Sequence, residues 1–181
     1  MIDPDLYKTE VEPDLIRFGD RVVDEIWDLG RRCETEPPTL RSSPWGHDHN
    51  INTPPSDTLV TSTAWKRQKD ISAEEGLIAL AYSGTGTRCQ YRRLHQIAKL
   101  YLYAPSSGMF SCPLAMTDGA AAILTNQVRN GSQQYEKALG HLMSRDPRQF
   151  WTSGQWMTEK RGGSDVANGT QTFAVHTEGN R

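Results

Sequence analysis

Apolar residues recur with a helical period along most of this chain, and this periodicity limits the possible fold more than any other feature. The clearest case lies between Pro13 and Gly30, where apolar residues three or four positions apart fall on one face of a helix. These residues are Leu15, Phe18, Val22, Ile26 and Leu29. Pro13 suits the first turn of a helix, and Gly30 followed by two arginines is typical of a helix end. The pattern predicts an amphipathic helix from Pro13 to about Gly30.

Further helices are predicted after a proline-rich connection over residues 34–58. Their expected starts are residues that suit a helix N-terminus, namely Ser56, Ser72, Thr87, Pro113 and Ser132. The helix from Ser56 is expected to include Leu59, Val60 and Trp65. The helix after Thr87 carries an apolar stripe of Leu94, Ile97, Ala98, Tyr101 and Leu102. We expect such stripes to form the core or to contact another subunit, and Asp146-Pro147 to end the last helix.

The last thirty residues have a different character. Residues 150–157 and 171–176 are rich in aromatic residues, threonine and valine, which favour strands. Two strands alone do not make a stable sheet. We therefore expect a mainly α fold in which an N-terminal helical domain, residues 13–147, follows an extension over residues 1–12. Residues 148–181 are expected to begin an incomplete β-domain.

Charge, hydropathy and cysteine content exclude several classes of partner. The formal net charge is −2 and no run of Lys or Arg exceeds two residues, so a nucleic-acid partner is not expected for this portion. Apolar runs are far shorter than the ~20 residues of a membrane span. Three widely spaced cysteines fit a reducing, intracellular compartment, without distinguishing cytoplasm, peroxisome and mitochondrion. His47-Asp48-His49 is interpreted as a solvated loop rather than a metal site.

The stretch MTEKRGGSDV at residues 157–166 is the strongest candidate for a ligand-binding turn. Gly162 and Gly163 let the backbone adopt positive φ and approach a ligand closely. Consecutive N–H groups in such a turn can bind an anion, and Ser164 adds a hydroxyl at its rim. Composition alone leaves two readings open, because Gly-Gly-Ser-Asp also suits an ordinary surface loop.

The residues before the glycines extend the candidate site. Thr158 offers a hydroxyl to a heteroatom of a flat ring, while Trp156 and Met157 offer that ring apolar surface. Together with the glycine turn they would form a cradle for a dinucleotide, with the ring against the strand and the phosphates over the glycines.

Two motifs carry a resemblance to a known family. MTEKRGGSDV resembles the flavin-binding signature of the acyl-CoA dehydrogenases, and Cys112-Pro113-Leu114-Ala115-Met116-Thr117 resembles a stretch of the AidB-like branch of that family. The motifs occur in the same order as in the family, and the resemblance covers about residues 85–175. Trp156 and Asn168 depart from the pattern, which has small residues at both positions.

The resemblance implies a cofactor, a substrate class and a set of site residues. It implies FAD as cofactor and α,β-dehydrogenation of an acyl-CoA thioester. The cofactor-binding residues would be Gln155, Trp156, Met157, Thr158, Gly162, Gly163 and Ser164. Thr158 would contact the N5/O4 edge of the flavin ring, Gly163 and Ser164 the pyrophosphate, and Ser164 also the acyl-CoA. Met116 and Thr117 would lie near the flavin or in the core.

The resemblance also limits what this chain is expected to do alone. Glu159 is expected to have a structural role in the turn, and the catalytic base would come from a later helical domain, so no catalytic residue is assigned here. We expect a truncated N-terminal part that is inactive alone and that forms a homo-oligomer or associates with a C-terminal part. Two alternatives stay open: a non-catalytic AidB-like protein of the DNA alkylation response, and a helical interaction domain.

Overall fold

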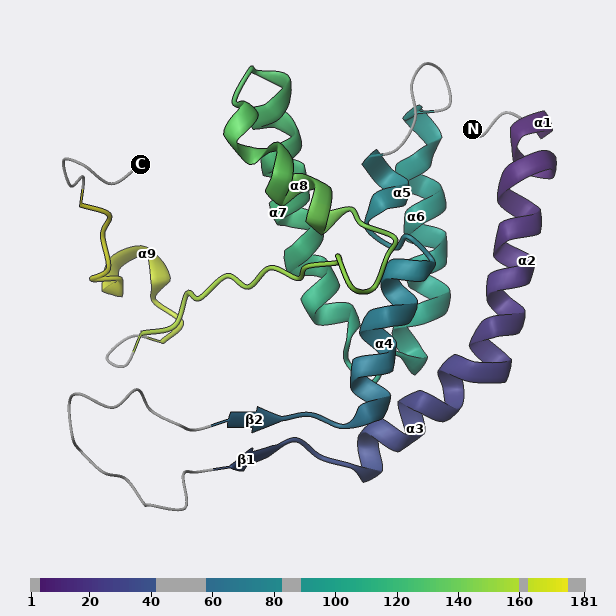
Figure 1. Cartoon of the computed structure of the whole chain (residues 1–181), viewed down its shortest axis with the longest axis horizontal. Coiled ribbons are helices and arrows are strands. Elements are labelled where there is room, and N and C mark those ends of the chain that lie inside the picture. The colour runs from purple at the N-terminus through teal and green to yellow at the C-terminus, as the bar shows by residue number, and fades with distance from the viewer. Residues whose placement is uncertain (1–3, 42–57, 83–88, 160–162, 176–181) are drawn as a thin grey trace.

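The computed structural model of the 181-residue chain describes residues 4–41, 58–82, 89–159 and 163–175. Its described part is mainly helical, with one short two-stranded sheet (Figure 1). Helical segments follow one another without a break from Pro4 to Thr35, and together they form a rod that bends between α2 and α3. They are α1 (Pro4–Leu6), η1 (Tyr7–Val11), α2 (Glu12–Arg21), η2 (Val22–Ile26) and α3 (Trp27–Thr35).

A hairpin connects this rod to the rest of the bundle. Strand β1 (Thr39–Arg41) pairs antiparallel with β2 (Thr58–Val60), with Leu40 opposite Leu59. Helix α4 (Thr63–Glu74) begins directly after the hairpin, and its N-terminus is capped by Ser62, whose side-chain Oγ accepts a hydrogen bond from Trp65 N at 3.0 Å. This cap satisfies one of the free N–H groups in the first turn of the helix.

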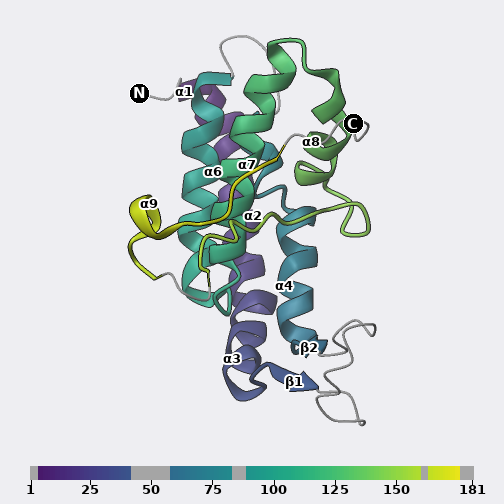
Figure 2. The same cartoon turned by 90° about the vertical axis from the view of Figure 1, so that its left-hand side faces the viewer.

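The remaining helices complete the bundle. They are α5 (Ala79–Tyr82), α6 (Cys89–Tyr103), η4 (Ala104–Ser106), α7 (Ser111–Arg129), η5 (Gln133–Tyr135) and α8 (Glu136–Leu142). After α8 the chain leaves the bundle and carries the short helix α9 (Val166–Gly169), which stands apart from the other helices in both views (Figures 1 and 2). No helix of the described residues is both long and apolar enough to cross a membrane.

The core is built where these helices meet. Its largest fully buried apolar side chains come from several helices and the turns between them: Phe18, Ile26, Ile71, Leu77, Ile78, Tyr103, Phe110 and Leu114. Burial of such side chains removes about 25 cal/mol of unfavourable hydration per Å² of apolar surface, and this drives the packing of the bundle. The expected mainly α fold is confirmed.

A network of buried charges joins the N-terminal rod to the bundle. Lys99 of α6 is buried, and its Nζ lies 2.9 Å from Glu75 Oε2 and 3.0 Å from Asp14 Oδ2. Arg17 and Arg21 of α2 also bind the Glu75 carboxylate. Each buried charge of this network therefore has a partner of opposite sign, which offsets part of the cost of removing it from water.

Several predicted helix limits are wrong. The first helix begins at Pro4 and runs past Gly30 to Thr35. Gly30 does not end it. A Cβ at that position would lie 2.5 Å from Ser106 O, so the glycine serves a close backbone contact between α3 and η4. Leu59 and Val60 form a strand rather than a helix.

Predicted capping residues also differ from those observed. Ser72 lies inside α4, where its Oγ donates to Lys69 O, and α4 ends before Gly76, which has a φ of 62°. Ser132 makes no side-chain capping hydrogen bond. Ser56 and Thr87 lie outside the described residues. Pro113 does stand in the first turn of a helix, α7.

The apolar stripe of α6 has only one of its two expected roles excluded. The helix forms, but Leu94, Ile97 and Tyr101 of the stripe are exposed and so are not part of the core of this chain. Its buried face carries polar residues, including Gln96 and Lys99. The charged and polar partners described above make this burial possible, and they come from segments distant in sequence.

The two predicted strands near the C-terminus are not formed in the described residues. Residues 150–159 run without regular structure, and residues 170–175 do not pair with them. Between these two stretches, Asn168 and Gly169 belong to the short helix α9. The described sheet lies instead in the hairpin between α3 and α4.

Candidate functional site

The segment that carries the candidate flavin residues is anchored to the bundle at its N-terminal end. Phe150 is buried in the core, and Trp151 N donates to His141 O at 3.1 Å. The Trp151 ring stacks on the His141 ring, with centroids 4.1 Å apart and planes 10° apart. These contacts fix where the segment leaves α8.

A second anchor connects the Cys-Pro…Met-Thr motif to the segment that leads into the glycine-rich signature. The Thr117 side chain of α7 is buried, and its Oγ1 accepts a hydrogen bond from Ser153 N at 3.0 Å. The same hydroxyl donates to Pro113 O at 2.7 Å. Thr117 therefore places the start of the signature segment on the helix that carries the Cys-Pro…Met-Thr motif.

Beyond Ser153 the candidate residues face solvent. Gln155, Met157 and Thr158 are exposed, and Trp156 is 95% exposed with a φ of 51°. The Trp156 ring lies against Gly154, where a Cβ would come within 3.1 Å of its Nε1. Positive φ is uncommon for a residue with a side chain, and it marks Trp156 as a strained position.

The residues after the segment fold into a loop closed by Glu159. Its carboxylate accepts hydrogen bonds from Gln171 N and Thr172 N, at 3.0 and 2.8 Å for the shorter contact of each. These hydrogen bonds, with Thr172 contributing most, lower the pKa of Glu159 and keep it ionised. This is the structural role expected for Glu159.

The second carboxylate of the signature is also engaged. Asp165 caps α9, and its Oδ1 accepts from Asn168 N at 3.3 Å and from Asn168 Nδ2 at 2.9 Å. A shallow depression on this loop is lined by Met157, Glu159, Gly163, Asp165, Val166, Gly169 and Thr170. It brings together two of the predicted cofactor-binding residues, Met157 and Gly163.

The other predicted residues are distributed around this loop. Thr158 and Ser164 are exposed, and among the residues that the structure describes neither hydroxyl has a hydrogen-bond partner. A Cβ at Gly163 would have no neighbour within 4 Å, so its backbone is accessible. Gly162 lies outside the described residues, as does His47-Asp48-His49. Within the described ranges no group of three or more metal-ligating side chains occurs.

No local sequence pattern predicted two contacts that position this segment. His141 belongs to no motif, and its stacking on Trp151 depends on the packing of α8 against the outgoing chain. Thr117 lies within the Cys-Pro…Met-Thr motif, so its position was marked, but its hydrogen bond to Ser153 was not.

This arrangement of helices has solved counterparts. It is the fold of the N-terminal part of an acyl-CoA dehydrogenase, as the structure of Caenorhabditis elegans ACDH-11 in complex with C11-CoA shows. That structure matches with a TM-score of 0.83 and 43% identity, over 97% of this chain and 29% of that chain. The apo form of Bd2924 matches with a TM-score of 0.79 and 39% identity, over 98% of this chain and 34% of that chain.

Sequence comparison gives the same relationship. Over 177 residues the chain is 44% identical to acyl-CoA dehydrogenase family member 11 of Caenorhabditis elegans. The match covers 97% of this chain but 27% of that relative's length. No family model matches the chain. The chain is therefore homologous to proteins named acyl-CoA dehydrogenases, and it spans about a quarter of the curated relative that it matches.

Proposed function

We propose that these 181 residues provide the N-terminal part of an FAD-dependent acyl-CoA dehydrogenase-like oxidoreductase. The substrate class is an acyl-CoA thioester, which loses hydrogen from its α and β carbons. The observation that carries the proposal is the hydrogen bond from Ser153 N to Thr117, which attaches the segment leading into the glycine-rich signature to the helix that carries the Cys-Pro…Met-Thr motif. Homology along 97% of the chain supports the same assignment.

The exposed residues of the loop fit the chemistry of a flavin dinucleotide. Met157 offers apolar surface, Thr158 an exposed hydroxyl, and Gly163 an accessible backbone beside the Ser164 hydroxyl. A flavin ring needs an apolar wall and a few hydrogen bonds, and a pyrophosphate needs backbone N–H groups. When bound, FAD would supply the hydride acceptor for the β carbon, and the protein would hold and orient it.

We assign the roles of the chain's own residues accordingly. The Thr158 hydroxyl would donate to the flavin ring, and Gly163 and Ser164 would contact the pyrophosphate. Gln155, Trp156 and Gly162 belong to the same proposed set, and Ser164 would also contact the acyl-CoA.

Neither carboxylate of the signature is proposed as the base that removes the α proton. Glu159 closes the loop and Asp165 caps α9, so both are committed to backbone N–H groups. A base must reach the proton it removes and have a pKa matched to that task, whereas the pKa of Glu159 is lowered. We infer that the base comes from outside this segment and that the 181 residues alone do not catalyse the reaction.

We propose that the exposed apolar stripe of α6 contacts another part of the enzyme or another copy of this chain. Leu94, Ile97 and Tyr101 leave apolar surface in solvent on one helix face. Exposed apolar clusters of this kind mark interaction surfaces more often than isolated residues do. An AidB-like placement rests on the Cys112–Thr117 motif and on Asn168 and Thr170, which follow Asp165 as in that branch. A DNA-binding role is not favoured for a portion with a net charge of −2.

A chimera tests the proposal. The matching N-terminal part of acyl-CoA dehydrogenase family member 11 would be replaced by this chain, and the product would be desalted after incubation with FAD. We expect retained flavin absorption and turnover of acyl-CoA with an artificial electron acceptor, and no turnover by the 181-residue chain alone. Thr158→Val should weaken flavin retention, whereas Thr152→Val, an exposed threonine of the same segment, should not.

Two results would contradict the proposal. A chimera that elutes and unfolds like the parent enzyme yet stays colourless would reject the flavin site. Turnover by the isolated chain would reject the inference that the base lies elsewhere.

A further inference from the structure

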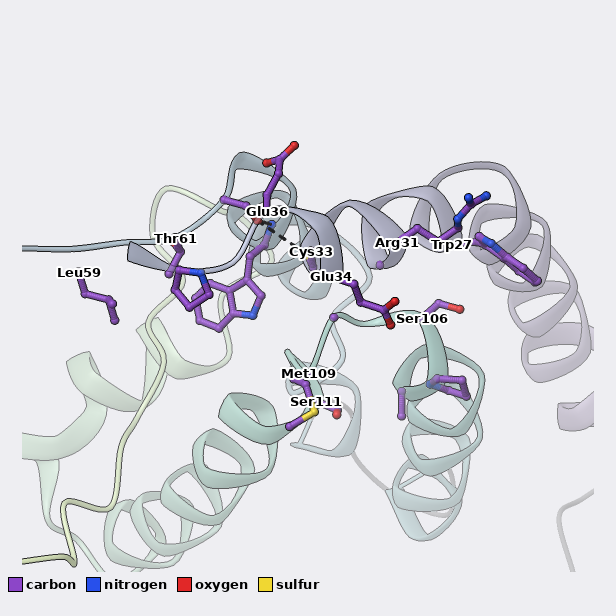
Figure 3. A pocket seen from close by; sticks show the side chains of 17 residues that line it. Trp27, Arg31, Cys33, Glu34, Glu36, Leu59, Thr61, Ser106, Met109 and Ser111 are labelled. Carbon is purple, nitrogen blue, oxygen red and sulfur yellow. Dashed lines mark hydrogen bonds between the residues drawn. The ribbon is translucent and has the colours of Figure 1, made fainter. Parts of the chain in front are cut away.

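A second concave site lies at the opposite end of the bundle from α8, where α3, the hairpin and the turn before α7 meet. Its volume is about 920 Å³, within the range of pockets that hold small organic molecules. Figure 3 shows Leu59 at one side of this pocket and Trp27 at the other, with Met109 between them. None of its lining residues belongs to residues 150–164.

The floor of this pocket is formed by close backbone packing. Gly30 of α3 leaves no room for a side chain beside Ser106 O, and Gly108 leaves none beside Cys33. Gly108 has a φ of 55°, which glycine adopts readily. The pocket is therefore shaped by fixed contacts between segments distant in sequence and does not depend on side-chain rotamers alone.

The walls of the pocket carry large apolar side chains that are exposed to solvent. Trp27, Leu59 and Met109 are all large, apolar and exposed around this one opening. Met109 also has a φ of 68°, an uncommon conformation for a residue with a side chain. Strain of this kind concentrates at ligand-binding sites, where surrounding contacts hold it in place.

The polar groups that line the pocket are either neutral or include charges of both signs. Ser62 Oγ lies 4.0 Å from Cys33 Sγ, which places a hydroxyl and a thiol side by side. Burial raises the pKa of the Cys33 thiol and so keeps it neutral. Of the charged lining residues, Glu36 pairs with Arg32 at 3.8 Å, while Arg31 and Glu34 carry opposite charges.

We propose that this pocket binds a small, uncharged and mainly hydrocarbon molecule whose polar end faces Cys33 and Ser62. The apolar walls provide the binding energy, and the hydroxyl and thiol orient the ligand. Cys33 and Ser62 carry no charge, so a charged group placed between them and the apolar walls would lose its hydration without a counter-charge beside it, which is costly. This site is additional to the proposed flavin-dependent function and does not rest on it.

The test uses Nile red, an uncharged apolar dye, with the full chain. We expect saturable fluorescence enhancement with one dye per chain. Leu59→Glu should weaken binding at least about tenfold, because it places a charge in the apolar wall. Leu40→Glu is the matched control, since Leu40 is the cross-strand partner of Leu59, is similarly exposed (63% against 65%) and does not line the pocket.

Cysteine labelling locates the dye independently. Bound Nile red should slow the alkylation of Cys33 by iodoacetamide, read by mass spectrometry. Cys112 is exposed and lies outside the pocket, so its labelling should not change.

Three outcomes would overturn the proposal. The first is the absence of saturable binding. The second is equal weakening by both glutamate variants, or unchanged labelling of Cys33, which would place the dye on another apolar surface. The third is a dimer, detected by light scattering, that Leu59→Glu alone dissociates, because the occupant would then be a second copy of this chain.

Discussion

The hydroxyl of Thr117 and the backbone N–H of Ser153 are joined by a hydrogen bond of 3.0 Å across a separation of 36 residues. One residue belongs to a buried helix and the other to the segment that carries the candidate flavin contacts. Because Thr117 also donates to Pro113 O, the proton of its hydroxyl points away from Ser153 and a lone pair is left to accept from Ser153 N–H. Thr117 is therefore the last anchor of the segment on the bundle before the signature, after Phe150 and Trp151.

Replacement of Thr117 by valine should release this anchor. The change keeps the shape of the side chain but removes the acceptor for Ser153 N–H, and we expect a loss of about 1–2 kcal/mol in the free energy of unfolding. Exchange of the Ser153 amide should be faster in Thr117→Val than in the original chain. Thr117→Ser, which keeps the hydroxyl, should restore most of the protection.

The matched control for this change is Thr125→Val on the same helix. Thr125 Oγ1 is buried and has no hydrogen-bond partner among the described residues. Its removal should therefore leave stability unchanged or raise it slightly. Equal destabilisation by both valine variants would show that Thr117 acts through helix packing and not through Ser153.

Acid should destabilise the protein through Glu75. Burial raises the pKa of this carboxyl, but hydrogen bonds from Arg17, Arg21 and Lys99 outweigh burial and lower it to about 2. The pKa of Glu75 in the folded protein is below its value of about 4.3 in the unfolded chain. Ionised Glu75 therefore adds fully to the free energy of unfolding above a pH of about 4.3, and this stabilisation is lost as the pH falls toward 2. The contribution is about 3 kcal/mol.

Urea unfolding at pH 7 and pH 3 measures this effect. Glu75→Gln should lower stability at pH 7 and flatten the dependence between the two pH values. Asp14, whose pKa is held well below its usual range by His95, Arg17 and Lys99 against the opposing effect of burial, would keep part of the slope. The exposed residue Glu12 serves as control, and a Glu12→Gln variant with the same flattening would contradict the assignment.

The sequence predicted the existence of most helices better than their faces or ends. The periodicity around α6 correctly indicated a helix, but Lys99 is buried because Asp14, 85 residues away, and Glu75 compensate its charge. Gly30 has the local appearance of a helix end, whereas its contact with Ser106 arises only in the folded bundle. Contacts of this kind, between residues distant in sequence, cannot be predicted from the local spacing of apolar residues.

For the candidate site, the sequence indicated which residues form the turn but not the conformation of the residues that contact it. The turn chemistry marked residues 157–166, and the structural role of Glu159 was expected. Its partners, Gln171 and Thr172, were expected to form a strand, and instead their N–H groups close a loop. Strand propensity over so few residues is weak, since it reflects packing against neighbours that the described residues do not supply.

Ser62 should contribute to stability where Ser132 does not. Ser62 caps α4 through Trp65 N, whereas Ser132 makes no side-chain cap hydrogen bond. We expect Ser62→Ala to lower the free energy of unfolding by about 1 kcal/mol, and Ser132→Ala to have little effect. Denaturant unfolding measures the free energy of unfolding of the two variants. An equal loss in both would show that the side-chain cap of Ser62 does not account for the effect.

Glu159 should be needed for loop closure but not for chemistry. Its carboxylate accepts from Gln171 N and Thr172 N, so Glu159→Ala leaves both N–H groups without this partner, and their amide exchange should be several-fold faster. Glu159→Gln keeps one carbonyl acceptor and should show an intermediate rate. In the acyl-CoA dehydrogenase chimera, Glu159→Gln should retain turnover with a shift in flavin affinity at most, because the loop can still close. A variant with tightly bound flavin and no turnover would identify Glu159 as the catalytic base, whereas faster exchange with turnover preserved would fix its role as the residue that holds the loop.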